Sequence, residues 1–64
     1  MKVNGSIIVL REKQSLLDFL ADQKYDIKKI AVERNGEIVP RSSYDRVVLK
    51  DEDTLEIVNF VGGG

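Results

Sequence analysis

The sequence predicts an α+β fold: a mixed sheet of about five short strands with one helix packed across one face. Three observations support this. Short apolar segments rich in β-branched residues recur along the chain. Two Asn-Gly pairs, at 4–5 and 35–36, stand between such segments, as in tight hairpins. Only the stretch 16–23 has apolar residues at helical spacing. At 64 residues, the chain has room for one small domain.

Composition excludes several classes of protein. The absence of Cys and His rules out disulfides and the usual zinc sites, and removes the commonest nucleophile and general base. Ten basic and eleven acidic residues are spread along the chain, which argues against a nucleic-acid partner. No apolar run reaches the length of a membrane span, and no charged leader precedes an apolar segment at the start. We therefore expect a cytoplasmic protein that binds neither nucleic acid nor membrane.

The first predicted element is a β-hairpin. Residues 1–3 and 7–10 are apolar runs, and Asn4-Gly5-Ser6 lies between them. Asn-Gly suits the type I′ turn because both of its central positions need a positive φ.

The helix is predicted from a cap and a stripe. Ser15 is a good N-cap, and Asp18 lies in the first turn, where a negative charge is favourable. Leu16, Phe19 and Leu20 follow at i, i+3 and i+4, so they form the face that packs on the core. The helix is short and depends on tertiary packing.

A second hairpin is predicted around Asn35-Gly36, joining 30–34 to 37–39. Pro40 lacks an N–H group, so the second of these strands should end there or lie at an edge of the sheet. Tyr44 is expected to close the bottom of the core with its hydroxyl reaching water.

The stretch 47–49 is a further short strand candidate, followed by a turn with the acidic cluster Asp51, Glu52 and Asp53. Such a cluster suggests a metal site, but it lacks the Gly and the distal Glu of a calcium loop. We therefore expect a solvated turn and no metal.

The final strand covers 54–60 and leads into Val61, Gly62, Gly63 and Gly64. The predicted order, β-β-α-β-β-turn-β, is that of the ubiquitin-like β-grasp fold, with the first and last strands adjacent at the centre of the sheet. We expect a β-grasp domain over residues 1–60 and a flexible tail over 61–64. The predicted core consists of Val3, Leu10, Leu16, Phe19, Leu20, Ile30, Val32, Leu49, Leu55 and Ile57.

Two interpretations of the glycine tail compete. Chain ends are often disordered, so the tail can be a frayed terminus or a linker. Alternatively it is the functional group, because glycines pass through a narrow channel without side-chain clashes. Four extended residues beyond Phe60 reach roughly 13 Å, enough to enter the active site of another protein.

The phase of the final strand predicts a docking surface. Leu55 and Ile57 point one way, so Val58 and Phe60 lie on the open face of the sheet, next to the tail. An exposed Val–Phe pair there would anchor a partner. The alternative is that strand twist or a bulge turns Phe60 into the core.

The sequence resembles the ThiS family, the sulfur carriers of thiamine biosynthesis, along its whole length. The resemblance rests on VERNGEIVPR at 32–41, Tyr44, Lys50-Asp51, Asp53, Glu56-Ile57-Val58, and Phe60-Val61 followed by Gly62-Gly63-Gly64. The Gly-Gly end is shared by all ubiquitin-like carriers, whereas its combination with the Asn-Gly-Glu-Ile-Val-Pro-Arg stretch is much more specific.

The resemblance implies a chemistry for the tail. A ThiF-like enzyme, using ATP and Mg²⁺, would adenylate the carboxylate of Gly64. Sulfur from cysteine, delivered through a desulfurase, would replace AMP, and a ThiG-like thiazole synthase would take sulfur from the thiocarboxylate. The chain itself has no Gly-x-x-x-x-Gly-Lys loop, so we expect it to bind no cofactor and to be a covalent co-substrate, not an enzyme.

Related functions stay open at this point. The same tail serves β-grasp carriers for molybdopterin or amino-acid synthesis, and ubiquitin-like modifiers that are joined to lysines. A non-covalent interaction domain would instead use the sheet surface alone.

Overall fold

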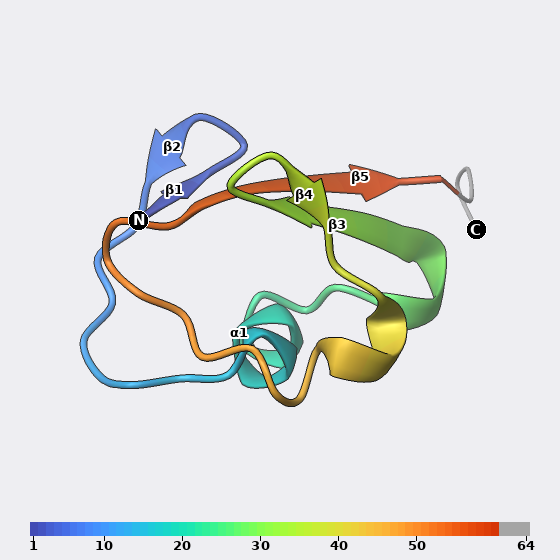
Figure 1. Ribbon diagram of the computed structural model, residues 1–64, viewed down its shortest axis with the longest axis horizontal. Helices are drawn as coiled ribbons and strands as arrows, with labels where there is room; N and C mark the ends of the chain where they lie inside the picture. Colours follow the sequence, from blue (N-terminus) through green and yellow to red (C-terminus); the bar gives the residue numbers. More distant parts are fainter. Residues whose placement is uncertain (61–64) are drawn as a thin grey trace.

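Five strands pair into one mixed sheet in the order β2-β1-β5-β3-β4 (Figure 1). The structure is a computed structural model, and it describes residues 1–60. β1 and β5 run parallel, and the other neighbours are antiparallel. The α+β class and the adjacency of the first and last strands are confirmed. The expected flexible tail, 61–64, lies outside the described residues.

The first hairpin joins β1 (Lys2–Val3) to β2 (Ser6–Ile7). Asn4 and Gly5 have φ values of 50° and 85°, as a type I′ turn requires. The predicted extension of the second strand to Leu10 is wrong. After Ile7 the chain leaves the sheet and crosses to the opposite layer, where the helix begins (Figure 1).

The second hairpin joins β3 (Ile30–Arg34) to β4 (Glu37–Ile38). Its turn repeats the geometry of the first, with φ values of 52° at Asn35 and 87° at Gly36. β4 forms an edge of the sheet and ends before Pro40, as predicted. After β4 come Pro40 and the 3-10 helix η2 (Arg41–Ser43).

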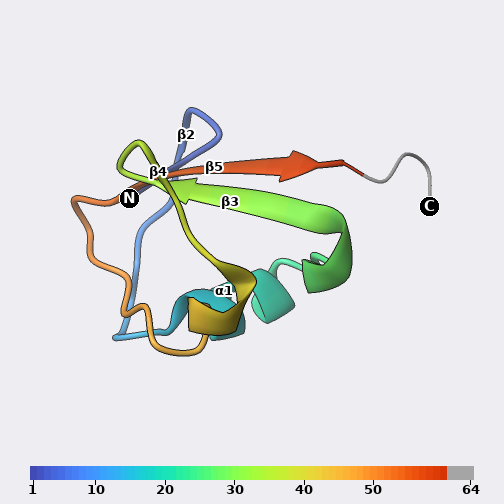
Figure 2. The same ribbon diagram turned by 45° about the vertical axis from the view of Figure 1, so that its right-hand side comes forward.

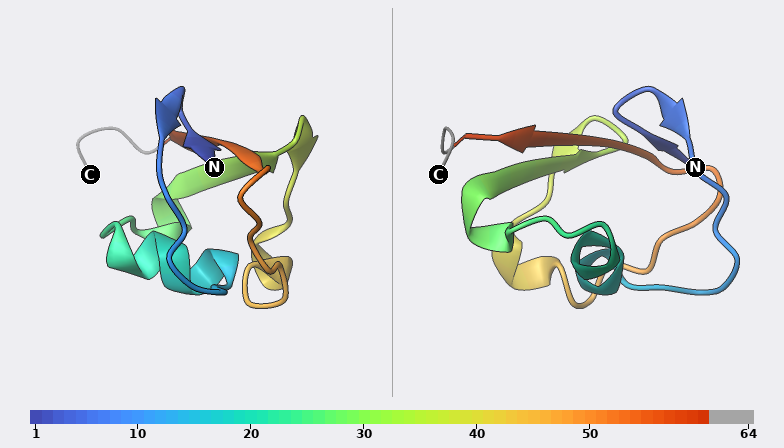
Figure 3. Two further views of the ribbon diagram at one scale, coloured as in Figure 1. Left: turned by 90° about the vertical axis from the view of Figure 1, so that its left-hand side faces the viewer. Right: turned by 180° about the vertical axis from the view of Figure 1, so that it is seen from behind.

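Helix α1 (Leu16–Asp22) begins as predicted, because the Ser15 Oγ accepts the N–H of Asp18 at 3.0 Å. Leu16, Phe19 and Leu20 are buried. α1 and η2 lie on the same side of the sheet, with α1 across its face (Figure 2). We call the other side the open face; none of the helices in residues 1–60 covers it (Figures 1 and 3). A second 3-10 helix, η1 (Ile27–Lys29), leads from α1 into β3.

The core lies between α1 and the sheet. Nine of the ten predicted core residues are buried, and Tyr44 is buried with them as expected. Leu10 is the exception: it is only partly buried, because it stands in the connection that leaves the sheet. Met1 was not predicted in the core, yet it is 8% exposed and packs there. The buried apolar residues are Met1, Val3, Leu16, Phe19, Leu20, Ile30, Val32, Tyr44, Leu49, Leu55 and Ile57.

The strand candidate at 47–49 does not join the sheet. It forms a single bridge between Val48 and Ser15, flanked by hydrogen bonds from Leu16 N to Val47 O at 2.8 Å and from Leu49 N to Gln14 O at 2.9 Å. Both edges of β5 are already occupied, by β1 and β3, so the apolar residues of this segment pack beside the start of the helix.

Candidate functional site

The candidate site is the end of β5 (Thr54–Asn59), the central strand that leads to the glycine tail. Its residues alternate as predicted: Leu55 and Ile57 are buried, whereas Glu56 and Val58 are exposed. Phe60 follows directly, and its N–H donates to the carbonyl oxygen of Lys29 at 3.0 Å. Pairing with β3 holds β5 as far as Asn59, and this bond to the end of η1 holds Phe60, the last described residue.

Val58 and Phe60 are 58% and 56% exposed. Phe60 does not turn into the core, so the alternative that twist or a bulge buries it is wrong. Their role in docking stays a prediction, as do the roles of the tail residues. Val61, Gly62, Gly63 and Gly64 lie outside the described residues.

Strand register places more apolar side chains on the same face as Val58. Ile7 pairs with Lys2, which pairs with Thr54; Ile38 pairs with Glu33, which pairs with Glu56. Because paired residues point to the same side of a sheet, Ile7 and Ile38 share the open face with Glu56 and Val58. They are 69% and 66% exposed, so the open face carries several large apolar side chains.

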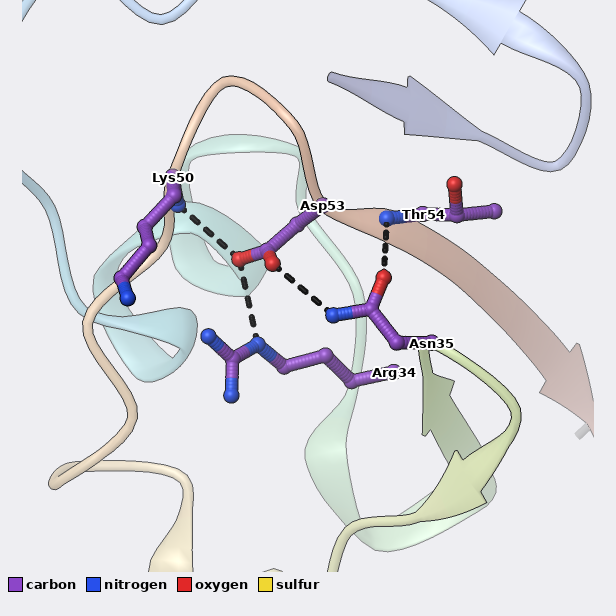
Figure 4. A network of polar contacts seen from close by, with 5 residues as sticks. All are labelled: Arg34, Asn35, Lys50, Asp53 and Thr54. Atoms are coloured by element: carbon purple, nitrogen blue, oxygen red, sulfur yellow. Dashed lines mark hydrogen bonds and ion pairs between the residues drawn. The ribbon is translucent and has the colours of Figure 1, made fainter.

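A polar network anchors the start of β5 (Figure 4). The carboxylate of Asp53 accepts hydrogen bonds from Arg34 Nε at 3.1 Å, Asn35 Nδ2 at 3.0 Å and Lys50 N at 2.9 Å. Asn35 also accepts the N–H of Thr54 at 2.9 Å. The network ties the second hairpin to the turn that leads into β5.

Asp53 corrects the expectation of a solvated acidic turn. Asp51 and Glu52 are exposed, but Asp53 is 3% exposed. Burial by itself would raise the pKa of Asp53; the hydrogen bonds from Asn35, Lys50 and Arg34, with the Arg34 charge, outweigh it and lower the pKa below its usual value. Over residues 1–60, no group of three His, Cys, Asp or Glu side chains is placed to hold a metal ion.

A second anchor lies on the other edge of β5. The side chain of Asn4 accepts the N–H of Ile57 at 2.7 Å and donates to the carbonyl oxygen of Ile57 at 3.2 Å. It bonds to β5 as a strand backbone would, after β1 has ended at Val3. Sequence reasoning used Asn4 only for its turn and missed this contact. The sequence signal for it was the Asn that precedes Gly in both turns. In the structure, both Asn side chains bond to β5 or to the residue before it.

Two surface pockets lie away from the described end of β5. Two pockets, of about 220 and 260 Å³, are lined by parts of the 8–14 connection together with α1 or with residues 49–51. Neither is lined by a residue of β5, so they are separate from the candidate site. None of the helices within residues 1–60 is long and apolar enough to cross a membrane.

Comparison with known proteins identifies the family. The model of the ThiS family matches residues 1–64, the whole chain. The chain belongs to the ThiS family. It is 38% identical over 65 residues to the sulfur carrier protein ThiS of Bacillus subtilis, covering all of this chain and 98% of that protein.

A solved structure and a longer relative extend the comparison. The crystal structure of the thiamine biosynthesis protein ThiS from Geobacter metallireducens matches with a TM-score of 0.78 and 33% identity, over 98% of this chain and 96% of that one. The ubiquitin-like fold is therefore confirmed within the ThiS family. A thiazole synthase of Paramagnetospirillum magneticum is 45% identical over 62 residues, which are 97% of this chain but 19% of that protein's length.

Proposed function

We propose that this protein is a sulfur carrier of thiamine biosynthesis and that the carboxyl group of Gly64 carries the sulfur. The observation that supports this most strongly is the match to the ThiS family along the whole chain, tail included. The full-length similarity to the sulfur carrier of Bacillus subtilis agrees with it.

The chemistry begins with activation of Gly64. An α-carboxyl group has an ordinary pKa of about 3.3–3.7, so near neutral pH it is an anionic nucleophile. Its oxygen attacks the α-phosphate of ATP on a ThiF-like enzyme, which supplies the ATP and Mg²⁺ sites, and pyrophosphate leaves as the acyl-adenylate forms. A carboxylate is otherwise a poor acyl donor, and adenylation gives it a better leaving group. Sulfur delivered as a persulfide by a cysteine desulfurase system then displaces AMP, and a thiol reductant cleaves the S–S bond of the resulting acyl disulfide to leave a thiocarboxylate.

The body of the protein supports the tail without taking part in the reaction. The Asp53 network and the side-chain bonds of Asn4 hold β5 at both edges, so the strand that leads to the tail is fixed in the sheet. Val58 and Phe60 are exposed where the strand ends and would provide the apolar anchor for the partner enzymes. Val61, Gly62 and Gly63 would then enter the active site of the partner. Catalysis belongs to the partners.

Mass spectrometry tests this proposal directly. Incubated with its adenylating enzyme, ATP, Mg²⁺ and a sulfur source, the protein should exchange one oxygen for one sulfur, located at Gly64. Deleting Gly64 withdraws the carboxylate by up to about 3.6 Å, far more than in-line attack tolerates, so this variant should not be adenylated. Replacing Gly63 with Trp should also block insertion while leaving the melting temperature unchanged, since no core residue is altered. A protein ending at Gly63 that is adenylated as fast as the parent would refute the proposal.

A further inference from the structure

Two carboxylates face each other on the open face of the sheet. Glu33 of β3 and Glu56 of β5 are direct partners in the antiparallel ladder. The Cβ atoms of such partners lie about 4.5–5.5 Å apart, and like charges in this position destabilise a sheet. The two negative charges therefore repel each other on the open face of the sheet.

Neither Glu33 nor Glu56 forms a salt bridge within residues 1–60, and Lys2, which shares the open face through its pairing with Thr54, forms none with them. The salt bridges found in residues 1–60 join Arg34 to Asp53 and Arg46 to Asp45. Arg34 is adjacent to Glu33 in sequence, but consecutive residues of a strand point to opposite faces, and its Nε bonds to the buried Asp53 (Figure 4).

Apolar side chains flank the acidic pair. Ile38 is the partner of Glu33 on β4, and Val58 follows Glu56 by two residues on the same face. Both are more than half exposed, as is Phe60 at the end of the strand. Exposed apolar residues can anchor a protein partner, and charged groups among them select a partner of complementary charge.

We propose that this face docks on a thiazole synthase that places a basic side chain between Glu33 and Glu56. The proposal rests on the proposed function and adds the chemistry of the contact. A guanidinium group fits best, because its planar set of donors can bond to two carboxylates at once. The thiazole synthase of Paramagnetospirillum magneticum favours this partner, since a stretch similar to almost all of this chain occurs within that synthase.

The test uses charge-neutral variants and the source organism's thiazole synthase. Glu33→Gln and Glu56→Gln should each weaken binding by about five-fold in titration calorimetry. Glu56→Lys should weaken it by more than about ten-fold, because it places a like charge against the partner's cation. The matched control is Glu52→Gln, which makes the same change in net charge in the exposed turn before β5 and should bind like the parent.

Thermal stability separates docking from folding. Removing one of two repelling charges should leave the melting temperature of each Gln variant equal to or above that of the parent. Binding by the Gln variants that matches the parent, or weaker binding accompanied by a lower melting temperature, would overturn the proposal. Thiocarboxylate formation by the adenylating enzyme, measured on the parent, reports on the proposed function separately. Failure of that reaction counts against the carrier role and not against this contact.

Discussion

At the scale of single residues, Asp53 shows how a buried charge is made stable. Its carboxylate leaves water, which is costly, but it gains three hydrogen bonds and the nearby guanidinium of Arg34. Two of the donors come from residues 18 and 19 positions away in sequence, so the side chain links two distant turns.

Replacing Asp53 with Asn should lower the free energy of unfolding by about 1–3 kcal/mol. The amide keeps one acceptor oxygen but turns its NH₂ group toward donors that then lack an acceptor. Urea unfolding measures the loss. Asp51→Asn, in the exposed part of the same turn, is the control and should leave stability nearly unchanged.

The same carboxylate predicts a pH dependence. The pKa of Asp53 is lowered in the native state: burial acts to raise it, and the hydrogen bonds and the Arg34 charge overcome that effect. A lowered native pKa adds stability that is fully present above the unfolded value of about 3.9 and is lost as the pH falls through the native value. The stability difference between the parent and Asp53→Asn should therefore shrink below about pH 4, and a constant difference down to pH 2 would contradict this explanation.

Asn4 combines two roles in one residue. Its backbone occupies the positive-φ position of a turn, and its side chain bonds to both backbone groups of Ile57. Asn4→Gly keeps the backbone conformation and removes only the side-chain bonds, so it isolates the second role.

This substitution should lower stability by about 1 kcal/mol and open one edge of β5. In hydrogen exchange, the amide of Ile57 should lose more protection than the amide of Val39, which bonds to Val32 in the other hairpin. Equal losses at the two amides would mean that the variant weakens the whole fold and not this edge.

At the scale of elements, α1 depends on the sheet. Seven residues are too few for an independent helix in water, so the buried stripe of Leu16, Phe19 and Leu20 holds it in place. The Ser15 cap marks where the helix begins but cannot supply this stability alone.

Leu20→Ala should lower the free energy of unfolding by about 2–5 kcal/mol, since Leu20 is fully buried. A small domain has little stability to lose, so chemical denaturation should show a large shift of the midpoint. Leu17→Ala, on the partly covered side of the same helix, serves as the control and should cost clearly less. Similar losses at the two positions would show that the buried face of α1 is assigned wrongly.

At the scale of the whole molecule, the two faces of the sheet differ in what covers them. One face of the sheet packs on the core against α1, and none of the helices in residues 1–60 covers the open face (Figure 2). β5 contributes side chains to both faces, because successive residues of a strand point to opposite sides of the sheet.

Phe60→Ala should weaken the complex with the adenylating enzyme by about ten-fold or more, in the range found for aromatic anchors at interfaces. Its melting temperature should stay within a few degrees of the parent, because Phe60 is 56% exposed. Val9→Ala, at an exposed position in the 8–14 connection, is the control for loss of surface hydrophobicity. A large fall in melting temperature for Phe60→Ala would show that the side chain supports the fold.

Much of this protein follows from its sequence by itself. The Asn-Gly turns, the capped and striped helix and the alternation along β5 are properties of a few consecutive residues, so backbone sterics and side-chain periodicity suffice to predict them. The exposure of Val58 follows from the same alternation. The full-length family pattern, tail included, is also written in the sequence.

Only the tertiary structure decided the remaining features. Asn4 bonds to a residue 53 positions away. Asp53, expected in a solvated turn, is instead buried and accepts hydrogen bonds from side chains of the second hairpin. Residues 47–49 have the composition of a strand but pair beside the helix, because β1 and β3 already occupy both edges of β5. These features depend on contacts between residues far apart in sequence, and the pattern of neighbouring residues does not specify such contacts.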